Sequence, residues 1–101
     1  MATLHTVNKS PFATKALQSC LAHARDGDVI LMIEDGVYGA TAGTDLADVL
    51  AGHSALKIYV LEPDLQARGL DTGRLLDGVS TVDYAGFVDL AATTDRTMAW
   101  L

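Results

Sequence analysis

The segment Val29 to Ile33 (VILMI) restricts the fold of this chain more than any other part of the sequence. All of its residues are apolar, so a strand formed here needs cover on both of its faces. Asp26-Gly27-Asp28 before it and Glu34-Asp35-Gly36 after it are typical of turns. A short apolar run between turns indicates a central strand of a parallel sheet that is covered by helices on both sides.

Other segments alternate between strand-like and helix-like patterns. The further predicted strands are Ala2 to Val7, Lys57 to Leu61, Val79 to Val82, and Met98 to Leu101 as a fifth strand or an extended tail. The predicted helices are Ala13 to Ala24 with Ser10 as cap and Pro11 at the first position, one or two short helices within Val37 to Leu50, Pro63 to Arg68 closed by Gly69, and Tyr84 to Thr93 capped by Asp83. Alternating strands and helices imply right-handed crossovers. We therefore predict one α/β domain over residues 1–101, with a small parallel sheet of about five strands between two layers of helices.

Composition bears on the partners of the chain. Half of the 101 residues are hydrophobic and only 20% are charged, which is a large apolar supply for one small domain. We expect part of this apolar surface to be covered by other chains. The net charge is -6 and the seven basic residues are scattered, so direct binding of nucleic acid is not expected.

The start of the chain and its cysteine content indicate a compartment. Met1 to Val7 lacks the features of a signal peptide, and no apolar run approaches the roughly 20 residues of a membrane-spanning helix. Cys20 is the only cysteine, so no disulfide framework is possible. These features predict a protein of the reducing cytoplasm with no membrane contact.

Neither a metal nor a cofactor is expected from the motifs. His5, His23 and His53 show no paired spacing, and one cysteine adds little to them. The glycines that follow the second predicted strand lack the spacing of a phosphate-binding loop. Because His5 lies inside a predicted strand, we expect a hydrogen-bonded structural role for it.

Cys20 lies in the middle of the first predicted helix. Its core stripe is Ala13, Leu17, Leu21 and Ala24, and Cys20 falls on the flank of that stripe, with His23 three residues further on the same side. A single thiol can carry a sulfur atom as a persulfide, fill space in a core, or bridge to another chain. A reactive thiol needs a stabilised thiolate, and the middle of a helix supplies little stabilisation. The residues alone favour a packed cysteine.

Two further features have a structural and a functional interpretation. Asp35, Glu62 and Asp83 each follow a predicted strand, at the edge of a parallel sheet where sites gather. They could form an acidic mouth, although Asp83 is also a good helix cap and Glu62 suits a helix start.

Trp100 is next to last, and we expect it to pack either into this core or against another subunit.

Several segments together resemble a known family over nearly the full chain. They are Leu4 to Phe12 (LHTVNKSPF), Glu34 to Tyr38 (EDGVY), Tyr59 to Gly69 (YVLEPDLQARG), Val82 to Leu90 (VDYAGFVDL) and Met98 to Trp100 (MAW). Their order and spacing are similar to those of the DsrH/TusB family. Cys20 stands where the DsrH branch has a cysteine, whereas TusB proteins typically lack that thiol, so the chain is more similar to DsrH.

The resemblance implies a fold and an assembly. It implies a DsrEFH-like sheet between helices, and a heterohexamer with two copies each of this chain and of DsrE-like and DsrF-like subunits. Such a complex is a cytoplasmic sulfurtransferase that passes persulfide sulfur to a DsrC-like carrier during sulfur oxidation. The principal active cysteine is expected on the DsrE-like partner. The alternatives are a TusB-like subunit of a sulfur relay for 2-thiouridine in tRNA, or a structural subunit whose cysteine is idle.

The resemblance also makes Cys20 a candidate persulfide carrier. Its thiolate would attack the outer sulfur of a persulfide and hold that sulfur for the next acceptor, as in ordinary thiol exchange. His23 is a weaker candidate, as a residue that modulates the proton of the thiol. This chemistry needs no cofactor and no metal.

Overall fold

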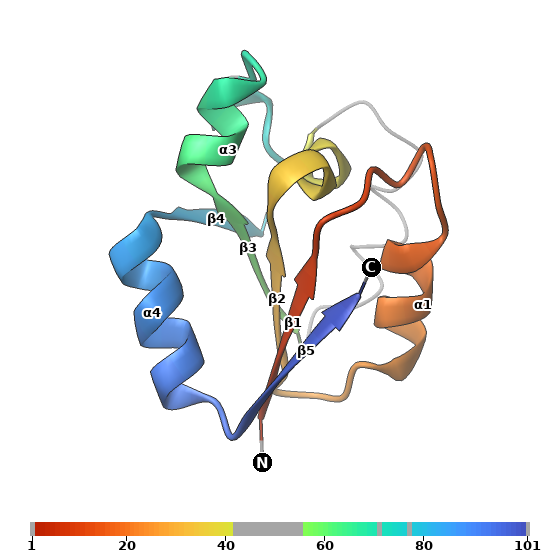
Figure 1. The fold of residues 1–101 in the computed structure, drawn as a ribbon, viewed down its shortest axis with the longest axis vertical. Helices are drawn as coiled ribbons and strands as arrows, with labels where there is room; N and C mark the ends of the chain where they lie inside the picture. The colour runs from red at the N-terminus through yellow and green to blue at the C-terminus, as the bar shows by residue number, and fades with distance from the viewer. Residues whose placement is uncertain (1, 42–55, 71, 77, 101) are drawn as a thin grey trace.

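The computed structural model describes residues 2–41, 56–70, 72–76 and 78–100, and the strands of these segments form one sheet (Figure 1). The strands are β1 (Thr3–Val7), β2 (Val29–Met32), β3 (Lys57–Leu61), β4 (Val79–Val82) and β5 (Arg96–Trp100). Neighbouring strands are parallel, and their order across the sheet is β4-β3-β2-β1-β5. The apolar run of the sequence therefore forms the central strand, and the predicted parallel α/β sheet is confirmed.

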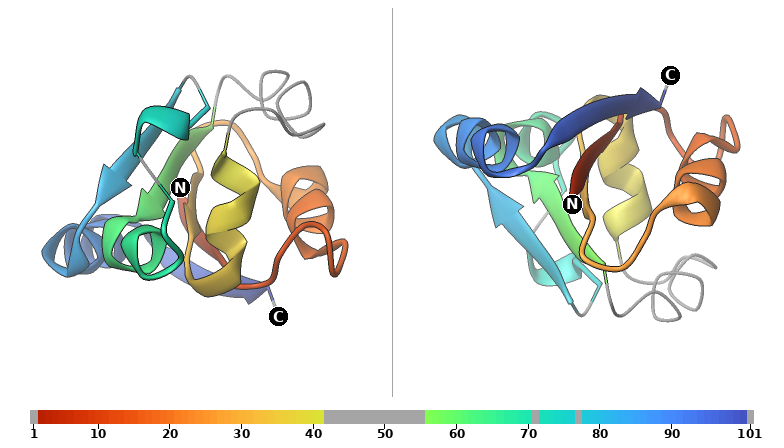
Figure 2. Two further views of the ribbon diagram at one scale, coloured as in Figure 1. Left: turned by 90° about the horizontal axis from the view of Figure 1, so that it is seen from above. Right: turned by 90° about the horizontal axis from the view of Figure 1, so that it is seen from below.

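Helices connect the strands and cover both faces of the sheet (Figures 1 and 2). They are α1 (Ala16–His23), the 3-10 helix η1 (Glu34–Ala40), α3 (Glu62–Ala67), the 3-10 turn η2 (Thr72–Arg74) and α4 (Tyr84–Thr93). Figure 1 shows α1 and α4 on opposite sides of the sheet, while α3 follows directly from β3 and packs against η1. The predicted arrangement of a sheet between helices is thus present.

Two apolar clusters fill the space between these layers. The cluster beneath α1 and η1 contains the buried residues Val7, Leu17, Cys20, Leu21, Ile30, Met32, Val37, Ala40, Ile58, Val60 and Leu65. The cluster beneath α4 contains buried Leu4, Val29, Leu31 and Leu61, with Phe87 and Leu90 of the helix packed against them. Burial of a large aliphatic side chain contributes about 1.5–3 kcal/mol, so both clusters are major sources of stability.

Helix α1 begins at Ala16 rather than at the predicted Ala13. The backbone carbonyl of Ser10 accepts hydrogen bonds from the N–H groups of Ala13 and Thr14, which closes a separate turn before the helix. Thr14 Oγ1 then accepts a hydrogen bond from the Ala16 N–H at 3.3 Å. This local bond between side chain and backbone replaces the first helical turn that the sequence predicts.

The apolar end of the chain is a strand rather than a loose tail. It pairs with β1 in the register Thr3–Arg96, His5–Met98 and Val7–Trp100, so it starts two residues before the predicted Met98. The Asp95 side chain accepts a hydrogen bond from the Ala2 N–H, and the Asp95 N–H donates to the Ala2 carbonyl, both at 2.8 Å. These two bonds fix the start of β5 against the start of β1.

The predicted helical segment within Val37 to Leu50 is described only in part. The 3-10 helix η1 begins at Glu34, earlier than expected, and a Cβ atom at Gly36 would collide with the Val7 carbonyl oxygen. Glycine therefore lets this turn approach the end of β1. The rest of the predicted segment, and His53, lie outside the described residues.

Candidate functional site

Cys20 is packed within the core and is not on an exposed flank. Its side chain is 0% exposed, and it belongs to the cluster beneath α1 together with Leu17 and Leu21. The partly buried Trp100 packs against the same cluster from β5. The edge strand thereby helps to cover a side of α1 that the sequence pattern left open.

The chemistry of the thiol follows from this burial. Burial raises the pKa of Cys20 from its ordinary value of 9.0 to about 12, and the negative charge of Asp28 adds to the increase. A thiolate is the form that attacks a persulfide, and at this pKa it is almost absent near neutral pH. The role of Cys20 as a persulfide carrier stays a hypothesis, and the geometry of the chain by itself favours a packed thiol.

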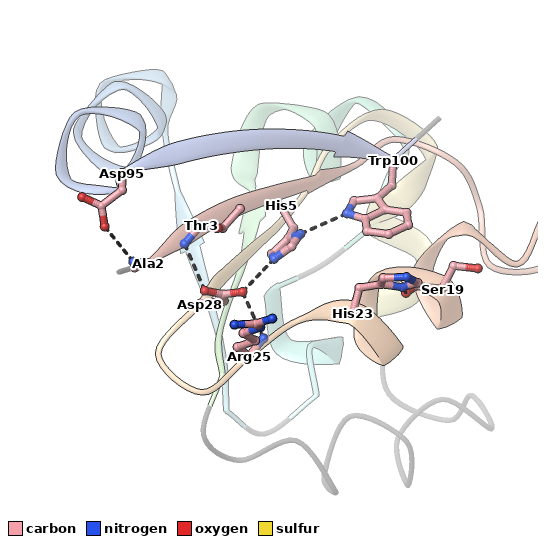
Figure 3. Close-up of polar contacts among 9 residues, drawn as sticks. All are labelled: Ala2, Thr3, His5, Ser19, His23, Arg25, Asp28, Asp95 and Trp100. Carbon is pink, nitrogen blue, oxygen red and sulfur yellow. Dashed lines mark hydrogen bonds and ion pairs between the residues drawn. The ribbon is translucent and has the colours of Figure 1, made fainter.

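His23 lies on the surface, at the last turn of α1. Its Nδ1 atom is 2.9 Å from the Ser19 carbonyl oxygen, and its ring centroid is 5.3 Å from that of Trp100 (Figure 3). Because a carbonyl oxygen only accepts, Nδ1 carries the proton of the neutral ring. The hydrogen bond of His23 thus goes to the helix backbone and not to the Cys20 thiol.

A buried polar network links β1, β5 and the turn before β2 (Figure 3). Trp100 Nε1 donates a hydrogen bond to His5 Nδ1 at 3.0 Å, and His5 Nε2 is 2.9 Å from Asp28 Oδ2. The indole N–H can only donate, so His5 Nδ1 must be unprotonated and Nε2 must carry the hydrogen. The expected hydrogen-bonded structural role of His5 is confirmed, and Trp100 packs into the core of its own chain.

Asp28 is the centre of this network and is 5% exposed. Besides His5, its carboxylate accepts hydrogen bonds from the N–H groups of Thr3 and Arg25, both at 3.0 Å. Burial by itself would raise the pKa of Asp28, but the hydrogen bonds from Arg25, His5 and Thr3 outweigh burial and hold the pKa below its usual value. The group is therefore an ionised carboxylate with its charge well compensated.

A cavity of about 300 Å³ opens beside this network, between β1, β5 and the end of α1. Its lining residues are Thr3, His5, His23, Arg25, Asp28, Arg96 and Met98. Of the predicted site residues, His23 lies in this cavity and Cys20 does not line it. Sequence reasoning missed Arg25 and Arg96, because they are isolated charges far apart in the chain.

The acidic residues at the strand ends serve structural roles. Asp83 caps α4, since its Oδ1 atom accepts a hydrogen bond from the Gly86 N–H at 2.8 Å. Asp35 accepts a hydrogen bond from Arg68 Nε at 2.9 Å, and Glu62 is the first residue of α3. The structural interpretation of these carboxylates thus fits better than an acidic mouth.

The described part of the chain offers no ready metal centre and no membrane span. Among these residues, no group of three or more His, Cys, Asp and Glu side chains is placed to hold a metal ion. No helix in the described ranges is long and apolar enough to cross a bilayer. The cavity beside β5 is therefore the best-defined candidate site.

Comparisons with known proteins place this fold in a family. The chain matches the family model described as "DsrH like protein" over residues 9–97. It is 37% identical over 97 residues to "Protein TusB" of Pectobacterium parmentieri and of Shigella flexneri, covering 96% of this chain and 99% of each relative. The crystal structure of the ychN protein of E. coli has the same fold, with a TM-score of 0.80 at 16% identity, covering 98% of this chain and 99% of that one. The family match spans most of the sequence, and the chain belongs to the DsrH/TusB family.

Proposed function

We propose that this chain is a non-catalytic subunit of a cytoplasmic sulfur-relay complex, in which a cysteine of a partner chain carries the persulfide. Family membership supports a place in sulfur relay. The observation that carries the non-catalytic role is the complete burial of Cys20, together with a pKa raised to about 12. A relay cysteine has to be accessible to two successive partners, and it has to react as a thiolate. The Cys20 thiol is buried within this chain and stays protonated near neutral pH, so it fulfils neither condition.

The surface of the chain supports a role in assembly. The large hydrophobic side chains Phe12, Tyr84, Val88 and Met98 are 42–72% exposed. Tyr84 and Val88 are four residues apart on α4, so they share one face of a helix that has no buried residue. An apolar helix face without cover is a common feature of subunits that pack against other chains. DsrE-like and DsrF-like subunits, with two copies of each chain, are the partners that we propose.

The first candidate pathway is sulfur oxidation. A DsrEFH-type complex would pass persulfide sulfur to a DsrC-like carrier, and the observation that favours this branch is the presence of Cys20 itself. The second candidate is a TusB-type relay for 2-thiouridine in tRNA, which the relatives named TusB favour at 37% identity. The two differ in the final acceptor, so transfer to a DsrC-like protein and restoration of 2-thiouridine in a cell that lacks TusB distinguish them.

The test of the non-catalytic role uses the assembled complex. After incubation with a sulfur donor, we expect mass spectrometry to find persulfide on a partner cysteine and none on Cys20. Cys20→Ala should leave the rate of transfer to the acceptor unchanged. Alanine is preferred to serine here, since serine would bury a polar hydroxyl in this apolar cluster. Persulfide on Cys20, combined with loss of transfer in the alanine variant, would restore the carrier hypothesis and refute this proposal.

A further inference from the structure

The cavity between β5 and the end of α1 contains an unusual concentration of positive charge for this chain. The whole sequence has seven Lys and Arg residues against thirteen Asp and Glu residues. Two of these seven, Arg25 and Arg96, line the same cavity of about 300 Å³. Asp28 also lines it and opposes them with a single negative charge, so the two guanidinium groups dominate.

The backbone holds both arginines in place while leaving their side chains available. The Arg25 N–H donates to Asp28 Oδ2 at 3.0 Å, and Arg96 lies opposite Thr3 in the β1–β5 pairing. No hydrogen bond or ion pair within the described residues occupies either guanidinium group, whereas Arg68 is bound to Asp35. These backbone contacts limit where the two side chains can reach, and ordering each free guanidinium group on a ligand is an entropy cost that its hydrogen bonds must exceed.

The other walls of the cavity suit an organic molecule. Met98 is 42% exposed and provides an apolar surface, and His23 presents its ring beside Trp100. The Nδ1 atom of His23 is engaged with the Ser19 carbonyl, so Nε2 of the neutral ring is an acceptor that suits a hydroxyl or N–H group on the organic part of a ligand. A volume of about 300 Å³ is at the lower end of small-molecule pockets and exceeds what a free phosphate ion fills.

We propose that this cavity binds a small phosphorylated organic molecule, with Arg25 and Arg96 holding the phosphate group. Guanidinium groups match phosphate oxygens in a bidentate geometry, and one phosphate group has enough oxygens to be bound by two guanidinium groups at once. One arginine is enough for a carboxylate, so the pair favours phosphate. The ligand site is separate from Cys20 and does not depend on the proposed place in a sulfur relay.

The experiment is a titration of the full-length chain, in the complex with its partner subunits where these are needed for solubility. Phenyl phosphate and benzoate are the probes, because they share a ring and differ in the anionic group. Trp100 is the only tryptophan of this chain, and its ring lies 5.3 Å from that of the lining residue His23, so its fluorescence reports on changes next to the cavity. We expect phenyl phosphate to bind at least about tenfold more tightly than benzoate at low ionic strength.

Charge-removing variants show which residues hold the phosphate. Arg25→Gln and Arg96→Gln should each weaken binding of phenyl phosphate by about tenfold or more, as expected for loss of hydrogen bonds to a charged group. Arg68→Gln is the matched control: it removes the same charge from the far end of the sheet and should leave the affinity unchanged. Because the two cavity guanidinium groups are exposed, unchanged melting temperatures should accompany the loss of binding.

Three results would overturn the proposal. The first is no fluorescence response to phenyl phosphate at about 10 mM, well above the range of a specific site. The second is equal binding of benzoate, or an equal loss of affinity in Arg68→Gln, which would mean that only the overall charge matters. The third is a response in the isolated chain that disappears in the assembled complex, because a partner's own segment would then fill the cavity.

Discussion

Cys20 in the folded chain should react with iodoacetamide at least about 1,000-fold more slowly at pH 8 than Cys20 in the unfolded chain. The perturbation is alkylation, which consumes only the thiolate. An increase in the pKa from 9.0 to about 12 lowers the thiolate fraction at pH 8 from about one in ten to about one in ten thousand. The ratio of these fractions is about 1,000.

Steric protection is an independent reason for slow labelling. Cys20 is 0% exposed, so the reagent reaches it only when α1 or the whole domain opens. For a domain with a free energy of unfolding of about 5–15 kcal/mol, the globally open fraction is below about one in a thousand. The folded protein should therefore label on a scale of many hours under conditions in which the unfolded protein labels in minutes.

The assay measures the mass increase of the intact chain with time, in buffer and in about 8 M urea. A double variant, Ser19→Cys with Cys20→Ala, is the matched control, because Ser19 is exposed on the same helix. This control should label in buffer at a rate close to that of the unfolded chain. If native Cys20 labelled within about tenfold of the unfolded rate, the thiol would be accessible as a thiolate, and the argument against a carrier role would be wrong.

Three further predictions concern stability. Cys20→Ala should lower the free energy of unfolding by about 1 kcal/mol through a small cavity, and Cys20→Ser by about 1–3 kcal/mol because it would bury a hydroxyl among apolar side chains, as urea titration of the two variants can show. Asp28→Asn should cost about 1–3 kcal/mol at pH 7 through weakened hydrogen bonds to His5, Thr3 and Arg25. Because the pKa of Asp28 is lower in the folded state, its stabilisation is present above the unfolded pKa of about 3.9 and is lost on further acidification. Urea titrations below about pH 4 should therefore show a smaller difference in the free energy of unfolding between Asp28→Asn and the native chain. Trp100→Phe should lower the melting temperature by leaving His5 Nδ1 without its donor, at a cost of about 0.5–1.5 kcal/mol, and an unchanged melting temperature would show that the indole N–H contributes nothing.

The sheet was predictable because its signals are local. The buried run of β2, the strand of β3 and the Asp83 cap of α4 each depend on a few consecutive residues. The predicted start of α1 at Ala13 is wrong because the Thr14 side chain accepts a hydrogen bond from the Ala16 N–H, in competition with a helical backbone bond. Such competition depends on which of two local geometries the rest of the fold supports, and a helical periodicity does not contain that information.

The burial of Cys20 was not readable from its helix alone. The spacing of α1 placed the thiol at the edge of the core stripe. A side chain at that position is covered if the sheet extends beneath it, and it is exposed if the sheet ends before it. The deciding element is β5, which adds to the sheet beside β1 and brings Trp100 against the cluster that contains Cys20. Because β5 comes from the far end of the sequence, the environment of the thiol depends on a contact that spans nearly the whole chain.

The same topology explains why the sequence pattern does not predict the charged cavity. The chain leaves β4 at one edge of the sheet, crosses through α4, and returns as β5 at the opposite edge, next to β1 (Figure 1). That crossover places Arg96 opposite Thr3 and beside the turn that carries Arg25. Carboxylates at the ends of parallel strands are usual candidates for a site. In this chain, however, Asp83 caps α4 and Asp35 forms an ion pair with Arg68. The guanidinium groups of the cavity are instead in the turn before β2 and at the start of β5, so the charged cavity lies at the opposite end of the sheet from the carboxylates that the sequence points to.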